Sequence, residues 1–199
     1  MTITNGYATL AEYKAQFFPT DQSDTADDAT IELVIEAASR AIDDHCFRRF
    51  YKNTVDETRY YSAEFDNILF VDDLVSITTL KTDEDGDRTY EQTWVATDYD
   101  LQPFNASLKS EPYGWIETTP NGSYSFPNTA KGVQIVGVFG WPSTPKQIKE
   151  ACLLQAHRLF KRKDAPFGVA GTGELGQVVM INKLDPDVLS LLSPWVLVI

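Results

Sequence analysis

Two cysteines and two histidines in this chain have side chains that could bind a metal ion or act in catalysis. His45 and Cys46 are adjacent, while Cys152 and His157 lie five positions apart in a second segment. Together they offer the ligand types of a zinc site or of a thiol–imidazole catalytic pair. On a helix, however, adjacent residues face different directions, and residues five apart point about 140° away from each other. The spacing therefore predicts no metal site and no local catalytic pair, and reduced, buried cysteines are expected.

A glycine-rich stretch has the letters of a dinucleotide-binding loop, Gly171-Thr-Gly173-Glu-Leu-Gly176. Such a loop needs a strand before it and a helix after it, so that the pyrophosphate meets a helix N-terminus. Here a predicted helix precedes the glycines and a strand-like run, Val178–Asn182, follows them. We therefore expect no bound cofactor, and a flexible loop that contains Gly168, Gly171, Gly173 and Gly176.

An acidic stretch, Asp83-Glu-Asp-Gly86-Asp87, contains the ligand types that calcium prefers. Its glycine comes too early for the twelve-residue calcium loop, and the closing bidentate glutamate is missing. The Asp-Gly pair instead predicts the solvated tip of a hairpin. No nucleophile has an evident base beside it in the sequence, so we expect a protein that is not an enzyme.

Two further groups of residues suggest binding. Arg48 and Arg49 stand among Phe47, Phe50 and Tyr51, a composition that can bind phosphate or stack on bases, or can simply pin a helix end. The chain also closes on the apolar run Trp195-Val-Leu-Val-Ile199. This run either folds back onto the core or docks into another protein.

Composition limits the partners. The formal charge is −12 over 199 residues, and residues 1–130 carry 24 acids against 9 Lys and Arg. Such a protein does not grip nucleic-acid phosphates over its whole surface. No window is apolar for the ~18 residues that a membrane span needs. No export signal is visible at the N-terminus.

The order of predicted elements is helices, then strands, then helices. Helices are expected from Thr9 to Phe17, where Thr9 and Glu12 form a capping box, and from Ala26 to Cys46. A third is expected from Thr144, its N-cap, to Asp164, and a short one follows its cap Asp185. Strands are expected at Arg59–Ser62, Ile68–Val71, Val75–Lys81, Arg88–Trp94, Trp115–Thr118 and Val133–Phe139.

This order predicts an α+β fold, a small helical bundle with two long helices and a β-rich insert between them. The helical parts are 7–50 and 144–199, the insert is 54–139, and the whole of 1–199 is expected to be a single domain. The two long helices should pack together through Ile35, Ile42, Ile148, Cys152 and Leu159.

Two separated motifs resemble a known family. The segment Ile35–Phe50 is similar to the second helix of head–tail connector (adaptor) proteins of tailed bacteriophages and gene transfer agents. The segment Val138–Pro142, followed by Pro145 and the helix through Ile148-Lys-Glu-Ala151, is similar to that family's third helix. Asp185–Pro194 resembles its C-terminal segment. One departure is Phe47, which stands where a glycine is common.

The resemblance implies a structural role in the virion, at the head–tail interface, after assembly in the host cytoplasm. Proteins of this family form a ring, usually twelvefold, beneath the portal protein. The ring extends the DNA channel and provides the platform for a stopper or tail. It implies three partners besides further copies of the chain: portal protein, a stopper or tail-completion protein, and double-stranded DNA that passes without sequence recognition. The single domain 1–199 would then be a connector domain, and no membrane is involved.

The apolar C-terminal segment is the expected portal-docking element, through Leu191, Leu192, Trp195, Leu197 and Ile199. The glycines upstream of it would let it swing. Two alternatives stay open at this point: a stopper or tail-completion protein of the same assembly, and a hydrolase that uses scattered carboxylates.

Overall fold

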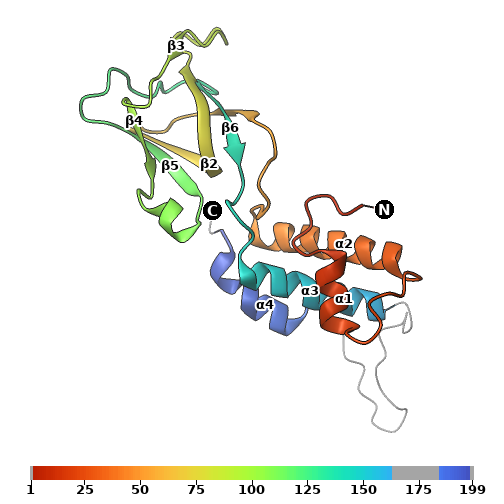
Figure 1. Cartoon of the computed structure of the whole chain (residues 1–199). Coiled ribbons are helices and arrows are strands. Elements are labelled where there is room, and N and C mark those ends of the chain that lie inside the picture. Colours follow the sequence, from red (N-terminus) through yellow and green to blue (C-terminus); the bar gives the residue numbers. More distant parts are fainter. Residues whose placement is uncertain (1, 163–183, 198–199) are drawn as a thin grey trace, which may run out of the picture. The chain divides into compact units, whose positions relative to one another are not determined.

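The computed structural model describes residues 2–162 and 184–197. The chain divides into two compact units (Figure 1). The helical unit comprises Met1–Phe50 and Thr144–Ile199, and the sheet unit comprises Tyr51–Ser143. The sheet unit carries 15 acids against 6 Lys and Arg, a formal charge of −9, and the helical unit carries 14 against 11, or −3. Most of the negative charge therefore belongs to the sheet unit.

In the helical unit, α3 packs against both α2 and α4, and α1 packs against α2 (Figure 1). Its core holds the buried apolar side chains of α2 and α3 together with two buried polar residues, Ser39 and Gln155. The helices are α1 (Leu10–Phe17), α2 (Asp28–Cys46), α3 (Lys146–Lys161) and α4 (Pro186–Leu192), and α4 is followed by a 3-10 turn, Ser193–Trp195.

The helix ends follow from local chemistry. At α1 the Thr9 hydroxyl accepts the N–H of Glu12 while the Glu12 carboxylate accepts the N–H of Thr9, which confirms the predicted capping box. At α4 the Asp185 side chain accepts the N–H of Asp187, as its sequence predicts. The predicted start of α3 is wrong by one residue. Pro145 is the N-cap, and the Thr144 hydroxyl donates to the carbonyl of Phe50 instead.

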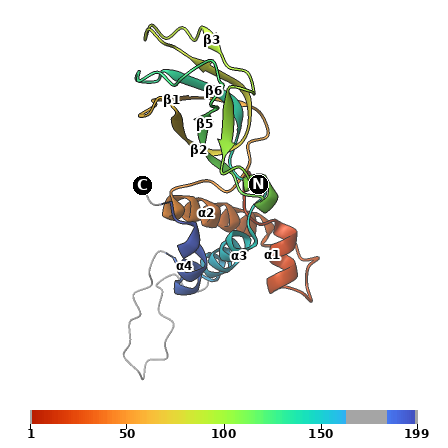
Figure 2. The ribbon, with the colours of Figure 1, turned by 90° about the vertical axis from the view of Figure 1, so that its left-hand side faces the viewer.

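The sheet unit holds six antiparallel strands in the described part of the chain (Figure 2). Their order across the sheet is β1-β6-β2-β5-β4, and β3 pairs separately with β2. A 3-10 turn, Ala106–Lys109, lies between β4 and β5. The strands are β1 (Glu57–Tyr61), β2 (Ile68–Thr82), β3 (Gln92–Thr93), β4 (Tyr99–Gln102), β5 (Tyr113–Thr118) and β6 (Val133–Phe139).

The strand β2 is the centre of this sheet. It is one strand of 15 residues, where the sequence predicted two separate strands, and it pairs with β6, β5 and β3 along its length. Register shifts between Phe70 and Leu74 and again beyond Leu74 interrupt the pairing. Such bulges interrupt the alternation of side chains between the two faces of the sheet, and the sequence pattern therefore predicted two strands. The strand β4 was not predicted, and β3 is shorter than expected.

The sheet unit has a hydrophobic core of its own. Ten buried residues form it, seven from β2, β5 and β6 and three from segments between strands: Ala63, Leu69, Leu74, Leu80, Trp94, Ile116, Phe126, Val133, Ile135 and Phe139. Trp94 stacks on Phe126 with ring centroids 4.7 Å apart and hydrogen-bonds the Thr82 hydroxyl through its indole N–H. The sheet unit therefore has a hydrophobic core that is separate from the core of the helical unit.

The expected fold class is therefore wrong. The described residues form four α-helices and a six-stranded antiparallel sheet with a β-rich core, not a small helical bundle with two long helices and a β-rich insert. The error came from the strand pattern, because the bulged β2 and the unpredicted β4 hid the extent of the sheet. The single connector domain 1–199 stays a prediction.

Candidate interaction surfaces

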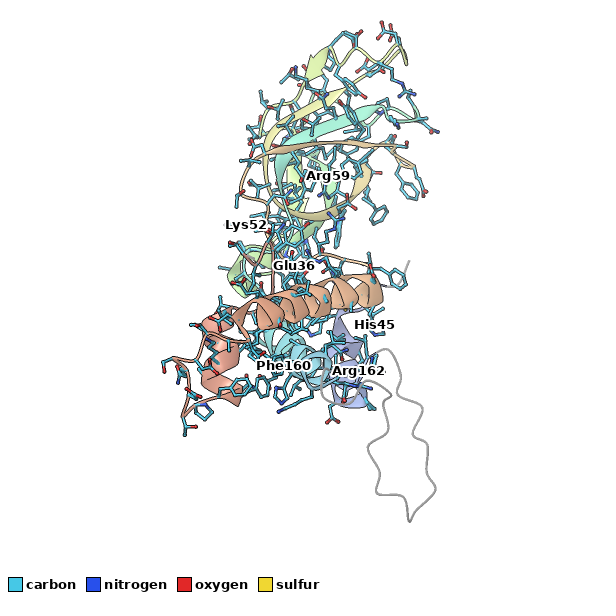
Figure 3. The ribbon with its side chains drawn as sticks, turned by 90° about the vertical axis from the view of Figure 1, so that its right-hand side faces the viewer. Glu36, His45, Lys52, Arg59, Phe160 and Arg162 are labelled. Atoms are coloured by element: carbon cyan, nitrogen blue, oxygen red, sulfur yellow. The ribbon has the colours of Figure 1, made fainter. Side chains whose placement is uncertain are left out.

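The predicted pair of core helices lies in the helical unit. Ile35 and Ile42 of α2 and Ile148 and Cys152 of α3 are fully buried, while Leu159 is only half-buried. Its neighbour Phe160 (Figure 3) is 3% exposed and packs edge-on against Tyr13 and Phe18. The buried face of α3 therefore turns toward Phe160 in its last turn, because the aromatic residues of α1 lie on that side.

The cysteines are both free and buried. Burial raises the pKa of the Cys46 and Cys152 thiols to about 11, which disfavours the reactive thiolate. Cys152 lies 3.4 Å from the Ser39 hydroxyl, inside the α2–α3 contact. Within residues 2–162 and 184–197, no cysteine or histidine belongs to a group that could hold a metal ion.

The acidic loop between β2 and β3 does gather carboxylates. The oxygens of Asp83, Asp85 and Asp87 lie within 4.8 Å of one another. The Asp83 carboxylate, however, accepts the N–H groups of Gly86 at 2.7 Å and Arg88 at 2.9 Å. Burial would raise its pKa, but these two N–H donors hold it below its usual range. The aspartates thus shape their own loop, as a hairpin tip requires.

The C-terminal segment begins with a helix that is fixed at its start. Arg158 of α3 forms an ion pair with Asp185 at 3.3 Å, and the side-chain oxygen of Gln155 accepts the N–H of Asp185. Val188 and Leu192 of α4 are fully buried. The helix α4 is therefore part of the core of the helical unit.

Beyond α4 the chain runs back to the end of α2. The indole of Trp195 meets the ring of Phe50 edge-on, with centroids 6.1 Å apart. Two residues later the N–H of Leu197 donates to the carbonyl of Cys46 at 2.9 Å. Such contacts are weak individually, since an edge-on ring pair or a single hydrogen bond contributes about 1 kcal/mol.

The predicted docking residues therefore differ in the solvent exposure of their side chains. Leu192 is buried, Leu191 and Trp195 are half-buried, and Leu197 is 43% exposed. Ile199 and the predicted flexible loop with Gly168, Gly171, Gly173 and Gly176 lie outside the described residues. The part of the tail that the structure describes is folded back, and its most accessible apolar side chain is Leu197.

A buried polar network supports the place where the tail lies. The Tyr7 hydroxyl donates to the Asp43 carboxylate and accepts the N–H of Phe50 at 2.8 Å. Arg40 completes the network through an ion pair with Asp43 at 3.0 Å. Burial raises the pKa of both Tyr7 and Asp43. Tyr7 thus ties the N-terminal segment to Phe50, the residue on which Trp195 packs.

The basic end of α2 is an exposed surface of mixed chemistry; we define it as Phe47, Arg48 and Arg49, which follow His45 (Figure 3) and Cys46. Phe47 caps the helix in the left-handed conformation at φ 55° and is 62% exposed. This conformation is easiest for glycine, so a phenylalanine here accepts backbone strain. Arg48 lies over the Phe50 ring at 6.0 Å, and Arg49 is exposed.

The sheet carries a second exposed aromatic surface, which the sequence did not reveal. Leu69 of β2 pairs with Ile116 of β5, and both are buried in the core. The next pair along, Phe70 and Trp115, therefore points to the opposite face of the sheet. Phe70 is 61% exposed and Trp115 is half-buried. We call Phe70 and Trp115 the outer-face platform.

Hydrogen bonds fix this platform. The Trp115 indole N–H donates to one oxygen of Glu117 at 2.9 Å, and the side-chain amide of Gln102 donates to the other at 3.1 Å. Gln102 in turn accepts the N–H of Phe104 at 3.0 Å. Asp100 lies opposite Glu117 in the register of β4 and β5, so a second acid borders the platform. The sequence offers no alternation that would place Phe70 on the outer face, because Ile68–Val71 is apolar throughout.

No protein-family model matches the chain, and no curated protein matches it either. Chains of three solved structures do match, each at 18% identity over 100% of this chain and 93% of the other. They come from the neck of an empty gene transfer agent (GTA) particle computed with C6 symmetry, the neck of a native GTA particle computed with C12 symmetry, and the virion of a native GTA particle.

The TM-scores of these three matches are 0.59, 0.58 and 0.60. The chain shares the fold of chains in GTA particles. The likeness extends over both the helical unit and the sheet unit, because the matches cover the whole chain. Among the described residues, no helix is long and apolar enough to cross a membrane.

Proposed function

We propose that this protein is a structural component of a particle neck, at the junction of head and tail in a tailed phage or a gene transfer agent. The observation that carries the proposal is the fold shared end to end with GTA particle chains, two of them from necks solved with C6 or C12 symmetry. The connector-like motifs at Ile35–Phe50 and Val138–Pro142 add support from the sequence.

The finer role that we propose is that of the head-to-tail adaptor. Copies of the chain would form a ring under the portal, extend the DNA channel and present a platform for the stopper or tail. Double-stranded DNA would pass without sequence recognition, since a sheet unit with a formal charge of −9 offers little to grip phosphates. The protein would act by assembly and not as an enzyme.

The portal contact is proposed to lie at the C-terminal segment. Leu197 is exposed there, and Trp195, a residue type common at interface hot spots, is only half-buried. The contacts that hold this tail include the edge-on contact of Trp195 with Phe50 and the backbone hydrogen bond from Leu197 to Cys46. A portal surface that buries Leu197 and the residues beyond it could compete with contacts of that strength.

The test is recruitment by the portal protein from the same genome. Purified portal rings are mixed with the full-length protein and separated by sedimentation, and the complex is imaged by electron microscopy. The adaptor role predicts a ring of this protein bound directly to portal. Binding only to a portal that already carries another ring protein would indicate the stopper position instead. Failure to join either assembly would overturn the neck proposal.

A further inference from the structure

The outer-face platform has no part in the proposed portal contact, yet it has the character of an interface. Phe70 and Trp115 are large aromatic side chains that stand side by side across two strands and face away from the core. Phe70 is 61% exposed and adjoins Trp115, and adjoining apolar side chains at a surface are a common mark of an interaction site. Trp115 is also fixed in place before any partner arrives, because Glu117 and Gln102 hold it in a chain of hydrogen bonds.

The surroundings of the platform select a cationic partner. Glu117 and Asp100 border it, and the whole sheet unit has an excess of nine acids over Lys and Arg. An arginine suits such a surface on two grounds. Its planar guanidinium stacks on indole and phenyl rings, and it pairs with carboxylates through directed N–H groups.

The same chain carries a surface of matching chemistry in its helical unit. The basic end of α2 combines an exposed aromatic ring, Phe47, with the exposed cation Arg49 and its neighbour Arg48. The left-handed cap at φ 55° turns Phe47 out at the end of the helix, where its ring is 62% exposed. The two surfaces are therefore complementary: each offers an exposed aromatic ring, and the arginines of the basic end of α2 match the acids that border the platform.

We propose that the outer-face platform binds the basic end of α2 of a second copy of this chain. The two surfaces are different parts of the chain, so the contact is head-to-tail and can repeat around a closed ring. The proposal deepens the neck function and rests on it, because it names the contact by which copies would join side by side. Arg49 of one copy meets Trp115 and the Asp100–Glu117 border of the next, and Phe47 packs on Phe70.

The test places a photo-crosslinking phenylalanine analogue at position 70 of the full-length protein, where a 61% exposed aromatic tolerates it. This protein is mixed at high concentration, without portal, with a second preparation of the protein that lacks the probe and is labelled with heavy isotopes. Mass spectrometry then identifies the linked peptides. We expect links from position 70 to the peptide around Phe47–Arg49 of the heavy copy. Links only within one copy, links to other segments of the second copy, or no links would overturn the proposal.

A second probe position and two charge variants control this experiment. The probe at Val95, which is 59% exposed and follows β3 at the opposite end of β2, should not link to the end of α2. In the heavy copy, Arg49→Glu should lower the yield of the position-70 link several-fold, whereas Lys109→Glu, an exposed cation of the sheet unit, should not. Equal yields from the two charge variants would contradict the charge pairing. The crosslinking experiment contains no portal. A failure of portal recruitment would therefore contradict the neck proposal without changing the interpretation of the crosslinks.

Discussion

The ring of Phe17 stacks on the imidazole of His157, with centroids 4.0 Å apart and planes only 11° from parallel. The Tyr13 hydroxyl lies 3.0 Å from Nδ1 of the same imidazole. Residues from α1 and α3, 140 positions apart in the sequence, thus close over one histidine. Burial, with a smaller effect from Lys161, lowers the pKa of His157 below its ordinary value.

This contact predicts a dependence of stability on pH. In the unfolded chain His157 takes up a proton near pH 6.5, whereas the folded chain resists protonation until a lower pH. The free energy of unfolding should therefore fall as the pH drops through about 6.5. Urea unfolding at pH 7.5 and 5.5 measures the loss. His157→Gln should show a smaller loss than the wild type. An unchanged pH dependence in His157→Gln would contradict the prediction.

Tyr7→Phe should destabilise the helical unit. The change removes the hydroxyl that donates to Asp43 and accepts the N–H of Phe50, so two buried polar groups lose that partner. A buried group left without its hydrogen bond costs about 1–3 kcal/mol. Urea unfolding should show a loss in that range. Tyr60→Phe, at a half-exposed tyrosine of the sheet unit, is the control and should stay within about 0.5 kcal/mol of the wild type.

Truncations on α3 should rank by burial. Ile148 is fully buried, so Ile148→Ala should cost about 2–5 kcal/mol of unfolding free energy. Leu159 is half-buried, and Leu159→Ala should cost nearer 1 kcal/mol, although the sequence predicted a core position. Both losses are read from the same denaturant series. Equal losses would mean that the buried face of α3 does not turn toward Phe160.

The helices were predictable because each has a local signal. The capping box at Thr9, the apolar period from Ile31 to Ile42, and the Asp185 cap each act within a few residues. The strand β6 was also predicted with its observed bounds, since it alternates between buried and half-buried residues along its whole length. Local propensity and tertiary packing agree in these segments.

The sheet as a whole was not predictable on the same basis. Which strands pair, and where β2 shifts its register, depends on contacts between distant segments. Each register shift also changes which face of the sheet the following residues of β2 occupy. The outer-face platform was missed for this reason, because Phe70 identifies an outer face only once its pairing with Trp115 is known. The fold-back of Trp195 and Leu197 was one of two possibilities that the sequence left open.

Gly140→Ala should strongly destabilise the sheet unit. Gly140 has φ +106°, and a Cβ built there would lie 1.8 Å from the carbonyl oxygen of Tyr51. Its N–H also donates to the carbonyl of Asp73 at 2.7 Å, so the backbone cannot move away freely. Strain in this region of φ alone costs about 1–3 kcal/mol, and the clash adds to it. Gly114→Ala is the matched control, because nothing lies within 4 Å of its Cβ. Equal melting temperatures for the two variants would contradict the close approach.

The last prediction separates the two roles of the C-terminal tail. Deletion of Ser193–Ile199 removes the Trp195 ring from Phe50 and the Leu197 N–H from the Cys46 carbonyl. Each lost kcal/mol lowers the melting temperature of a chain of this size by about 2–4 °C, so a drop of several degrees is expected. Trp195→Ala, which keeps the backbone, should show part of that drop.

Portal binding of the same variants completes the test. Leu197→Lys alters the exposed apolar side chain and leaves the backbone bond to Cys46 in place. We expect it to melt like the wild type but to lose portal binding, because a lysine is costly to bury in an apolar contact. Thr89→Lys, at an exposed position of the sheet unit, should keep both properties. If Leu197→Lys and the deletion both still bind portal, the portal contact lies elsewhere on the chain and the tail serves only the stability of the helical unit.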